Sequence, residues 1–144
     1  MASIERRVLT KVTQVDGSIR ERSTAKTWSS LTEVYERQLA IAASATVVVW
    51  DPTNDAGVPA SFDVLQLTAT VDLELELTCN EGDADEELSH LPLEAGVEFC
   101  LGADDARYTY TTDSYAGTLD VIDKIRVKEV NAVAGNLYVL IGKV

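Results

Sequence analysis

Residues 65–79 read LQLTATVDLELELTC, and apolar and polar side chains alternate along this stretch without a break. A period of two is typical of a β-strand that buries one face and exposes the other. A single straight strand of this length would span about 50 Å at ~3.3 Å per residue, which is longer than strands usually are. We therefore expect a bend or a change of sheet at residues 69–72, in a sheet with one wet face that is antiparallel.

Further strands are expected on both sides of this stretch, separated by turns rich in Gly, Asn, Asp and Pro. They cover residues 46–50, 97–101, 107–112, 118–130 and 136–143. Short strands at roughly ten-residue spacing, with no helix between them, indicate a sandwich or a barrel. The sequence therefore predicts an all-β fold, an antiparallel β-sandwich or jelly-roll-like domain over residues 43–144.

The composition changes near residue 40. Residues 1–40 hold seven basic and five acidic side chains, whereas residues 41–144 hold five basic and nineteen acidic ones, and the whole chain has a net charge of −12. Large apolar side chains are spread too thinly over the first thirty residues to form a core. We expect residues 1–42 to be an extended N-terminal arm, either a frayed tail or a segment that becomes ordered by docking on a partner.

The end of this arm carries a helix signal. The segment Ser30–Glu33 fits a capping box, and the apolar residues that follow are spaced for one face of a short helix over residues 31–42. The alternative is an extended segment that leads directly into the strand at residues 46–50.

A docking arm would use its basic and aromatic side chains, because arginines pair with carboxylates of a partner and an indole buries a large apolar surface. The candidate interface residues are Arg6, Arg7, Lys11, Arg20, Arg22 and Trp28.

No arrangement of residues in the sequence points to catalysis. The single histidine, His90, is expected in a loop, and no nucleophile motif accompanies it. The acidic segments 81–87 and 104–105 lack the ligand spacing of a calcium loop, so we expect solvated loops there. The sequence thus predicts a protein that is not an enzyme, with no catalytic residue, no metal site and no cofactor.

Two predictions concern structure inside the sheets. The acidic residues Asp72, Glu74 and Glu76 have the same spacing as the basic residues Lys124, Arg126 and Lys128, which indicates a ladder of cross-strand ion pairs. Cys79 and Cys100 are expected to be buried reduced thiols, and a cross-link between them requires neighbouring strands.

The charge of −12 and the pI of about 4.3 argue against nucleic acid and anionic membranes as partners. No apolar run approaches the ~20 residues that span a bilayer. The first residues have no apolar stretch behind their charges, so we expect no secretory signal.

Several segments within residues 46–144 resemble small structural proteins of tailed bacteriophages. They read DPTND (51–55), FDVLQL (62–67), VDLELELT (71–78), PLEAGVEF (92–99), LGADD (101–105) and GTLDVIDKIRV (117–127). The last segment is the most specific, because it is similar to a hairpin region of β-sandwich proteins attached to phage heads. The first forty residues have no counterpart in this resemblance.

The resemblance implies a non-enzymatic capsid decoration (cement) protein. Such a protein would be a homotrimer made in the host cytoplasm, and on the virion it would bind the major capsid protein and stabilise the assembled head shell. One alternative is another virion component, such as a tail or head–tail connector protein. Another is a carbohydrate- or host-binding β-sandwich, for which Tyr108, Tyr110 and Tyr115 would be the candidate contacts.

Overall fold

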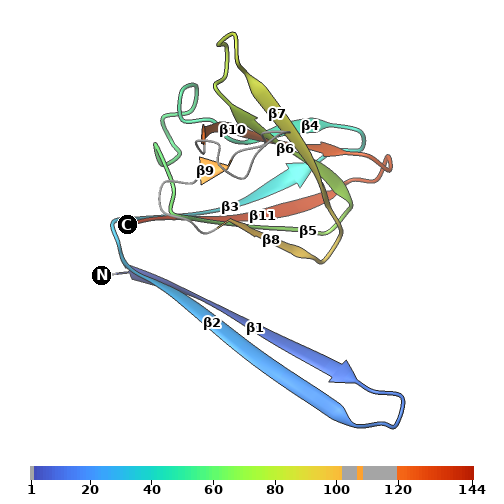
Figure 1. Cartoon of the computed structure of the whole chain (residues 1–144). Helices are drawn as coiled ribbons and strands as arrows, with labels where there is room; N and C mark the ends of the chain where they lie inside the picture. Colours follow the sequence, from blue (N-terminus) through green and yellow to red (C-terminus); the bar gives the residue numbers. More distant parts are fainter. Residues whose placement is uncertain (1, 102–106, 109–119) are drawn as a thin grey trace.

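The computed structural model describes residues 2–101, 107–108 and 120–144, and all regular structure among these residues is β-strand. An N-terminal hairpin stands apart from two packed sheets (Figure 1). In chain order the strands are β1 (Ala2–Thr13), β2 (Ile19–Leu31), β3 (Glu33–Ile41), β4 (Thr46–Trp50), β5 (Val64–Ala69), β6 (Leu73–Cys79), β7 (Glu87–Leu93), β8 (Glu98–Leu101), β9 (Arg107–Tyr108), β10 (Asp120–Glu129) and β11 (Gly135–Lys143).

The two packed sheets have the strand order of a jelly roll. One sheet runs β3-β11-β5-β8 and the other runs β4-β10-β6-β7, with β9 pairing beside β10, and every pairing is antiparallel. If the eight main strands from β3 to β11 are numbered from one, the orders are 1-8-3-6 and 2-7-4-5, in which the chain winds between the sheets as two Greek keys. The predicted antiparallel sandwich of the jelly-roll type is confirmed.

The long alternating stretch changes sheet where its length required a break. β5 ends at Ala69 in one sheet and β6 begins at Leu73 in the other. The odd-numbered residues of both strands point into the same interior from opposite sides. They are all buried: Leu65, Leu67, Ala69, Leu73, Leu75, Leu77 and Cys79. One continuous pattern of alternation therefore supplies both layers of the sandwich.

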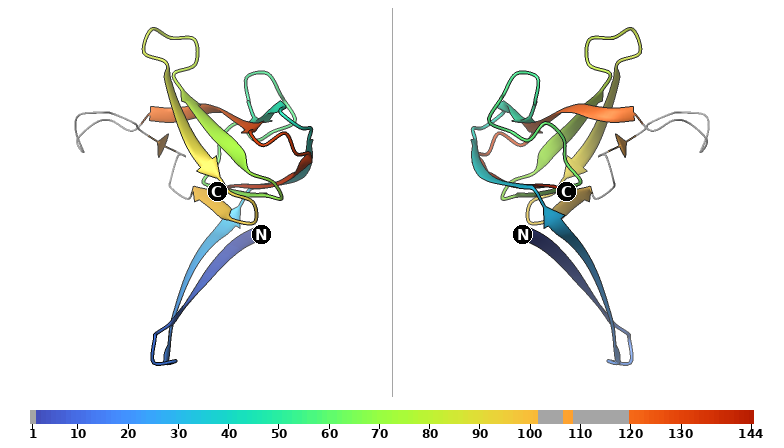
Figure 2. Two further views of the ribbon diagram at one scale, coloured as in Figure 1. Left: turned by 90° about the vertical axis from the view of Figure 1, so that its right-hand side faces the viewer. Right: turned by 90° about the vertical axis from the view of Figure 1, so that its left-hand side faces the viewer.

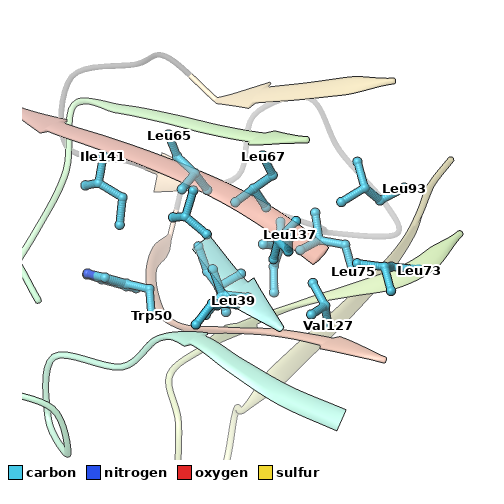
Figure 3. Close-up of a cluster of buried hydrophobic side chains, with 14 of the residues drawn as sticks. Leu39, Trp50, Leu65, Leu67, Leu73, Leu75, Leu93, Val127, Leu137 and Ile141 are labelled. Atoms are coloured by element: carbon cyan, nitrogen blue, oxygen red, sulfur yellow. The ribbon is translucent and has the colours of Figure 1, made fainter. Parts of the chain in front are cut away.

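Aliphatic side chains fill the space between the sheets (Figure 3). Leu67 from one sheet and Leu75 from the other are fully buried, and burial of such side chains is the main stabilising term of a core. At one end the indole Nε1 of Trp50 donates a hydrogen bond to the Pro59 carbonyl at 2.8 Å, and the ring meets Phe62 edge to face with centroids 5.0 Å apart. The interior of the jelly roll is a packed core.

A β-bulge in β10 changes which of its side chains face this core. Strict alternation would place Val121, Ile125 and Val127 on one face, but the register against β6 shifts between Ile122 and Lys124. Ile122 is buried together with Ile125 and Val127. The bulge inserts one residue, so the buried positions pass from even to odd numbers along the strand.

The helix predicted for residues 31–42 is wrong. Residues 33–41 are β3, which pairs with β11 along its whole length. Leu39 and Ile41 are buried and Tyr35 is half-buried on the same face, so the strand period of two prevails over the capping-box signal. The sandwich consequently begins at residue 33, whereas we expected it to begin at residue 43.

The residues before β3 form a hairpin where we expected an extended arm. β1 and β2 pair antiparallel from Ala2–Leu31 at the base to Thr13–Ile19 at the tip. The tip turn is closed by an Asp16 side chain that accepts a hydrogen bond from the Ser18 amide at 2.9 Å, and by Gly17 at φ +81°. The hairpin projects away from the jelly roll (Figures 1 and 2).

The segment that we expected to be a loop around His90 is the edge strand β7, which pairs with β6. Pro92 lies in this strand, where an edge position tolerates the missing amide donor. The His90 ring lies 2.9 Å from the Glu74 carboxylate and 3.6 Å from that of Glu76. The histidine therefore sits on the outer face of a sheet, beside the acidic positions of β6.

Candidate interaction surface

The hairpin is anchored at its base on the outer face of the β3-β11-β5-β8 sheet. Ile4 of β1 and Leu31 of β2 are buried against Val64 of β5, and partly buried Trp28, Cys100 and Leu140 pack around them. Gly142 of β11 leaves room for this contact, since a Cβ there would lie 2.8 Å from Ile4 Cδ1 and 2.8 Å from Val64 Cγ1. This cluster is separate from the main core.

An ion pair reinforces the same junction. The Arg6 guanidinium donates a hydrogen bond to the Glu98 carboxylate of β8. This bond raises the pKa of Arg6 above its ordinary value. Farther along β2, the Lys26 ammonium lies 5.8 Å from the centroid of the Trp28 ring, within the range of a cation–π contact.

The pairing of β1 with β2 sorts the side chains of the hairpin into two faces, because successive side chains of a strand point to opposite sides. Even-numbered residues lie opposite one another from Ile4–Trp28 to Val12–Arg20. We call this the basic face, because its charged residues are all cations. They are Arg6, Arg20, Arg22 and Lys26.

The opposite face of the hairpin is balanced in charge. Its Arg7 donates a hydrogen bond to Glu5, and its Lys11 lies 2.9 Å from Glu21 across the strands. On the basic face, by contrast, no carboxylate of the described part of the chain pairs with Arg20, Arg22 or Lys26. The unneutralised charge of the hairpin is therefore concentrated on one side.

The predicted interface residues divide into three groups. Arg6 and Trp28 lie at the anchored base, Arg7 and Lys11 pair within the balanced face, and Arg20 and Arg22 are exposed on the distal basic face. The sequence reading did not find Lys26, Ile4, Leu31 or Gly142. The signal for Lys26 was present in the sequence, since all cations of residues 20–26 stand at even positions, whereas Glu21 stands at an odd one.

Beyond its base the hairpin lacks partners among the described residues. Its two strands pair only with each other, and four apolar side chains are more than half exposed: Leu9, Val12, Val15 and Ile19. A two-stranded hairpin in water is at best marginally stable unless something covers it. These side chains lie on both faces and at the tip of the hairpin, where they are available for contact with another protein.

A shallow groove of about 520 Å³ lies on the outer face of the same β3-β11-β5-β8 sheet. Its lining consists of residues from β3, β5 and β11, which include Glu36, Gln38, Gln66, Tyr138 and Leu140, and none from the hairpin. Tyr138 is 47% exposed. We call this surface the sheet groove.

The ion-pair ladder predicted on the other sheet is present in part. Arg126 donates to Glu76 at 2.6 Å, and Lys128 lies opposite Glu74 in the register of β10 with β6. Lys124 lies opposite Thr78, and its ammonium instead reaches Asp51 at 3.3 Å and also pairs with Glu81.

These contacts shift two pKa values in the direction that keeps both groups charged. The hydrogen bond to Glu81, followed by that to Asp51, raises the pKa of Lys124. The Asn54 side chain, which donates to Asp51 at 2.9 Å, is the main cause of the lowered pKa of that carboxyl, to which Lys124 adds. These contacts stabilise the fold, because they hold the loop after β4 against β10.

Over the described residues, no group of three or more His, Cys, Asp or Glu side chains is placed to hold a metal ion. Within the acidic loop, Glu86 accepts a hydrogen bond from the Gly82 amide at 2.8 Å. Asp104 and Asp105, Tyr110 and Tyr115 lie outside the described residues, and Tyr108 is described only as part of β9.

Two further features bear on the sequence predictions. Cys79 on β6 is buried and Cys100 on β8 is half-buried, and their strands belong to different sheets and are not neighbours. Among the described residues there is no helix that is long and apolar enough to cross a bilayer.

No protein-family model and no curated protein matches the sequence. A solved structure that resembles the chain is the Schizosaccharomyces pombe Cnp3 cupin domain, at 13% sequence identity and a TM-score of 0.40, with 99% of this chain and 84% of that chain covered. The fold described above rests on the strand order of the chain itself.

Proposed function

We propose that this chain is a non-enzymatic structural subunit of a larger particle, and specifically a capsid decoration protein on the head of a tailed bacteriophage. The observation that carries the proposal is the β1–β2 hairpin, which projects from the jelly roll with exposed apolar side chains and uncompensated cations. Such a ribbon is suited to reach a neighbouring subunit. The choice of a phage head as the particle rests on the resemblance of several segments within residues 46–144 to phage virion proteins.

The mechanism of such a subunit is mass action. Each copy that binds the assembled shell and not its separate parts shifts the equilibrium toward the shell. The jelly roll supplies a rigid body with a packed core, and the hairpin supplies a second point of attachment. Two linked contacts bind far more tightly than either alone, because the second contact forms within the complex. The partners in this proposal are the major capsid protein and other copies of the chain.

The proposal is tested by mixing the full chain with phage heads that lack their decoration protein and measuring binding by co-sedimentation. We expect saturable binding at a fixed number of copies per capsomer, and bound heads that resist heat better than bare ones. Absence of binding to heads, or binding to tails alone, would overturn the decoration role.

A matched pair of variants tests the part that the hairpin plays. V12S/I19S removes exposed apolar side chains from the hairpin, whereas V130S/V133S removes two similarly exposed ones from the far end of the sandwich. We expect the first variant to weaken binding to heads and the second to leave it unchanged. Equal binding by all three proteins would show that the hairpin makes no contact with the particle.

A further inference from the structure

We propose that the basic face of the hairpin docks in the sheet groove of a second copy of this chain. The inference deepens the proposed function and rests on it in one respect, that the hairpin is the docking element. It adds the identity of one partner and the two surfaces that meet.

The distribution of charge favours a second copy as the occupant. The hairpin, residues 2–31, carries six basic and three acidic side chains, a net charge of +3. The remaining residues, 32–144, carry six basic and twenty-one acidic ones, a net charge of −15. Every copy therefore holds a positive ribbon and a negative body, and opposite potentials steer such surfaces together.

The sheet groove offers the matching chemistry. Glu36 in its lining pairs with no cation of the described residues, and the neighbouring Arg37 lies 3.8 Å from the Asp55 carboxylate, while the exposed Tyr138 supplies apolar surface. On the basic face of the hairpin, Val8 lies opposite Thr24, and Val12 lies opposite the cation Arg20. An apolar centre flanked by charged groups on both partners is the ordinary anatomy of an interface.

The geometry of the fold leaves the groove open to another chain. The hairpin of the same chain packs on Val64, Cys100, Leu140 and Gly142 at one end of the outer face, and its distal strands then project away from the body (Figures 1 and 2). A two-stranded ribbon is about 5 Å wide between strand axes and packs about 10 Å above a sheet. A second copy can supply a hairpin there.

The test compares the self-association of full-length variants by sedimentation velocity over a range of protein concentrations and salt. The pair R22E/K26E and R7E/K11E each exchange one Arg and one Lys for Glu on the same hairpin, but on opposite faces. We expect the wild type to associate more tightly at low salt. R22E/K26E should weaken association at least about tenfold, and R7E/K11E should change it much less.

A complementary change tests the receiving surface. E36K should weaken association by itself, and a mixture of E36K with R22E/K26E should form heterotypic complexes that neither protein forms alone. Circular dichroism checks that each variant retains its strands, and E36Q, which removes charge without reversing it, should have an intermediate effect.

Three outcomes would overturn the inference: a wild type that stays monomeric at every concentration, equal weakening by both hairpin variants, or binding of a DNA duplex at physiological salt by the basic face. None of these outcomes bears on the attachment of single copies to heads, so the inference and the proposed function can fail independently.

Discussion

Ile4 of β1 packs over Gly142 of β11, and a Cβ placed on that glycine would lie 2.8 Å from Ile4 Cδ1. Positions without a side chain are rare on a sheet face, and here the gap admits the base of the hairpin. The same gap is bordered by Val64 Cγ1 at 2.8 Å and Leu31 Cδ2 at 3.3 Å. The base of the hairpin therefore rests on this position of the sheet.

Gly142→Val should therefore release the hairpin from the sheet while the jelly roll stays folded. Real Cβ atoms essentially never approach other heavy atoms within 3.0 Å, so either the hairpin or β5 must move. We expect faster amide exchange over residues 2–31, measured by hydrogen–deuterium exchange, and unchanged protection in β6 and β10.

Two variants serve as controls for this prediction. Thr68→Val adds no volume on the same outer face of the sheet, away from the hairpin, and should leave exchange unchanged. Gly142→Ala adds only the Cβ and should also speed exchange in the hairpin. Ile4→Val removes the Cδ1 that this Cβ would meet, so the double variant Ile4→Val/Gly142→Ala should regain part of the protection that Gly142→Ala loses. Unaltered exchange in Gly142→Val would contradict the proposed anchor.

Gly135→Ala should destabilise the jelly roll at the crossing between β5 and β6. A Cβ at Gly135 would lie 2.6 Å from Val71 Cγ1 and 2.7 Å from its Cγ2. Overpacking of this kind costs about 1–3 kcal/mol, which urea unfolding would measure. Val71→Ala in the same chain removes both methyl groups and should recover part of the loss, since Thr70 Oγ1 would still lie 2.8 Å from the added Cβ. A double variant no more stable than Gly135→Ala would place the strain elsewhere.

Val127→Ala and Val48→Ala form a matched pair on neighbouring strands. Val127 is fully buried in the core, whereas Val48 is 45% exposed on the opposite face of the same sheet. At ~0.8 kcal/mol per buried carbon, with an added cavity term, the first change should lower the free energy of unfolding by about 2 kcal/mol. The second should lower it by less than about 1 kcal/mol, and equal losses would show that the sheets do not pack as described.

The stability of the jelly roll should depend on the ionisation of Glu129. Its carboxylate accepts hydrogen bonds from the Ser44 and Asn131 amides, both at 2.6 Å, and so ties the β3–β4 turn to the β10–β11 turn. Burial raises the pKa of this group, but the amide hydrogen bonds, led by that of Ser44, outweigh burial and hold it below the ordinary 4.5.

Because the folded pKa lies below the unfolded one, this stabilisation is present above pH 4.5 and is lost as the pH falls through the folded value. Glu129→Gln replaces one of the two acceptor oxygens by an NH₂ group, which cannot accept a hydrogen bond from a backbone amide. The melting temperature of the variant should therefore be lower than that of the wild type at pH 7 and approach it in acid. Glu33→Gln, at an exposed position, should have no such effect. A difference that persists unchanged at pH 3 would contradict this role.

The N-terminal region shows why the sequence reading failed there. In residues 19–28 the three cations and Trp28 all stand at even positions, but a ribbon exposed on both faces has no apolar stripe to reveal its period. β3 shows a different failure, because its spacing at Tyr35, Leu39 and Ile41 fits part of a helix face as well as a strand. Only the partner strand β11 decides between the two.

The sequence by itself determined the all-β class, the antiparallel sheets and the change of sheet between residues 69 and 73, because alternation and chain length are local properties. Tertiary structure decided the rest: the bulge in β10, the strand at His90, and the seat of the hairpin on Gly142. These features depend on which residues lie opposite one another across strands distant in the chain, and local periodicity holds no information about such partners.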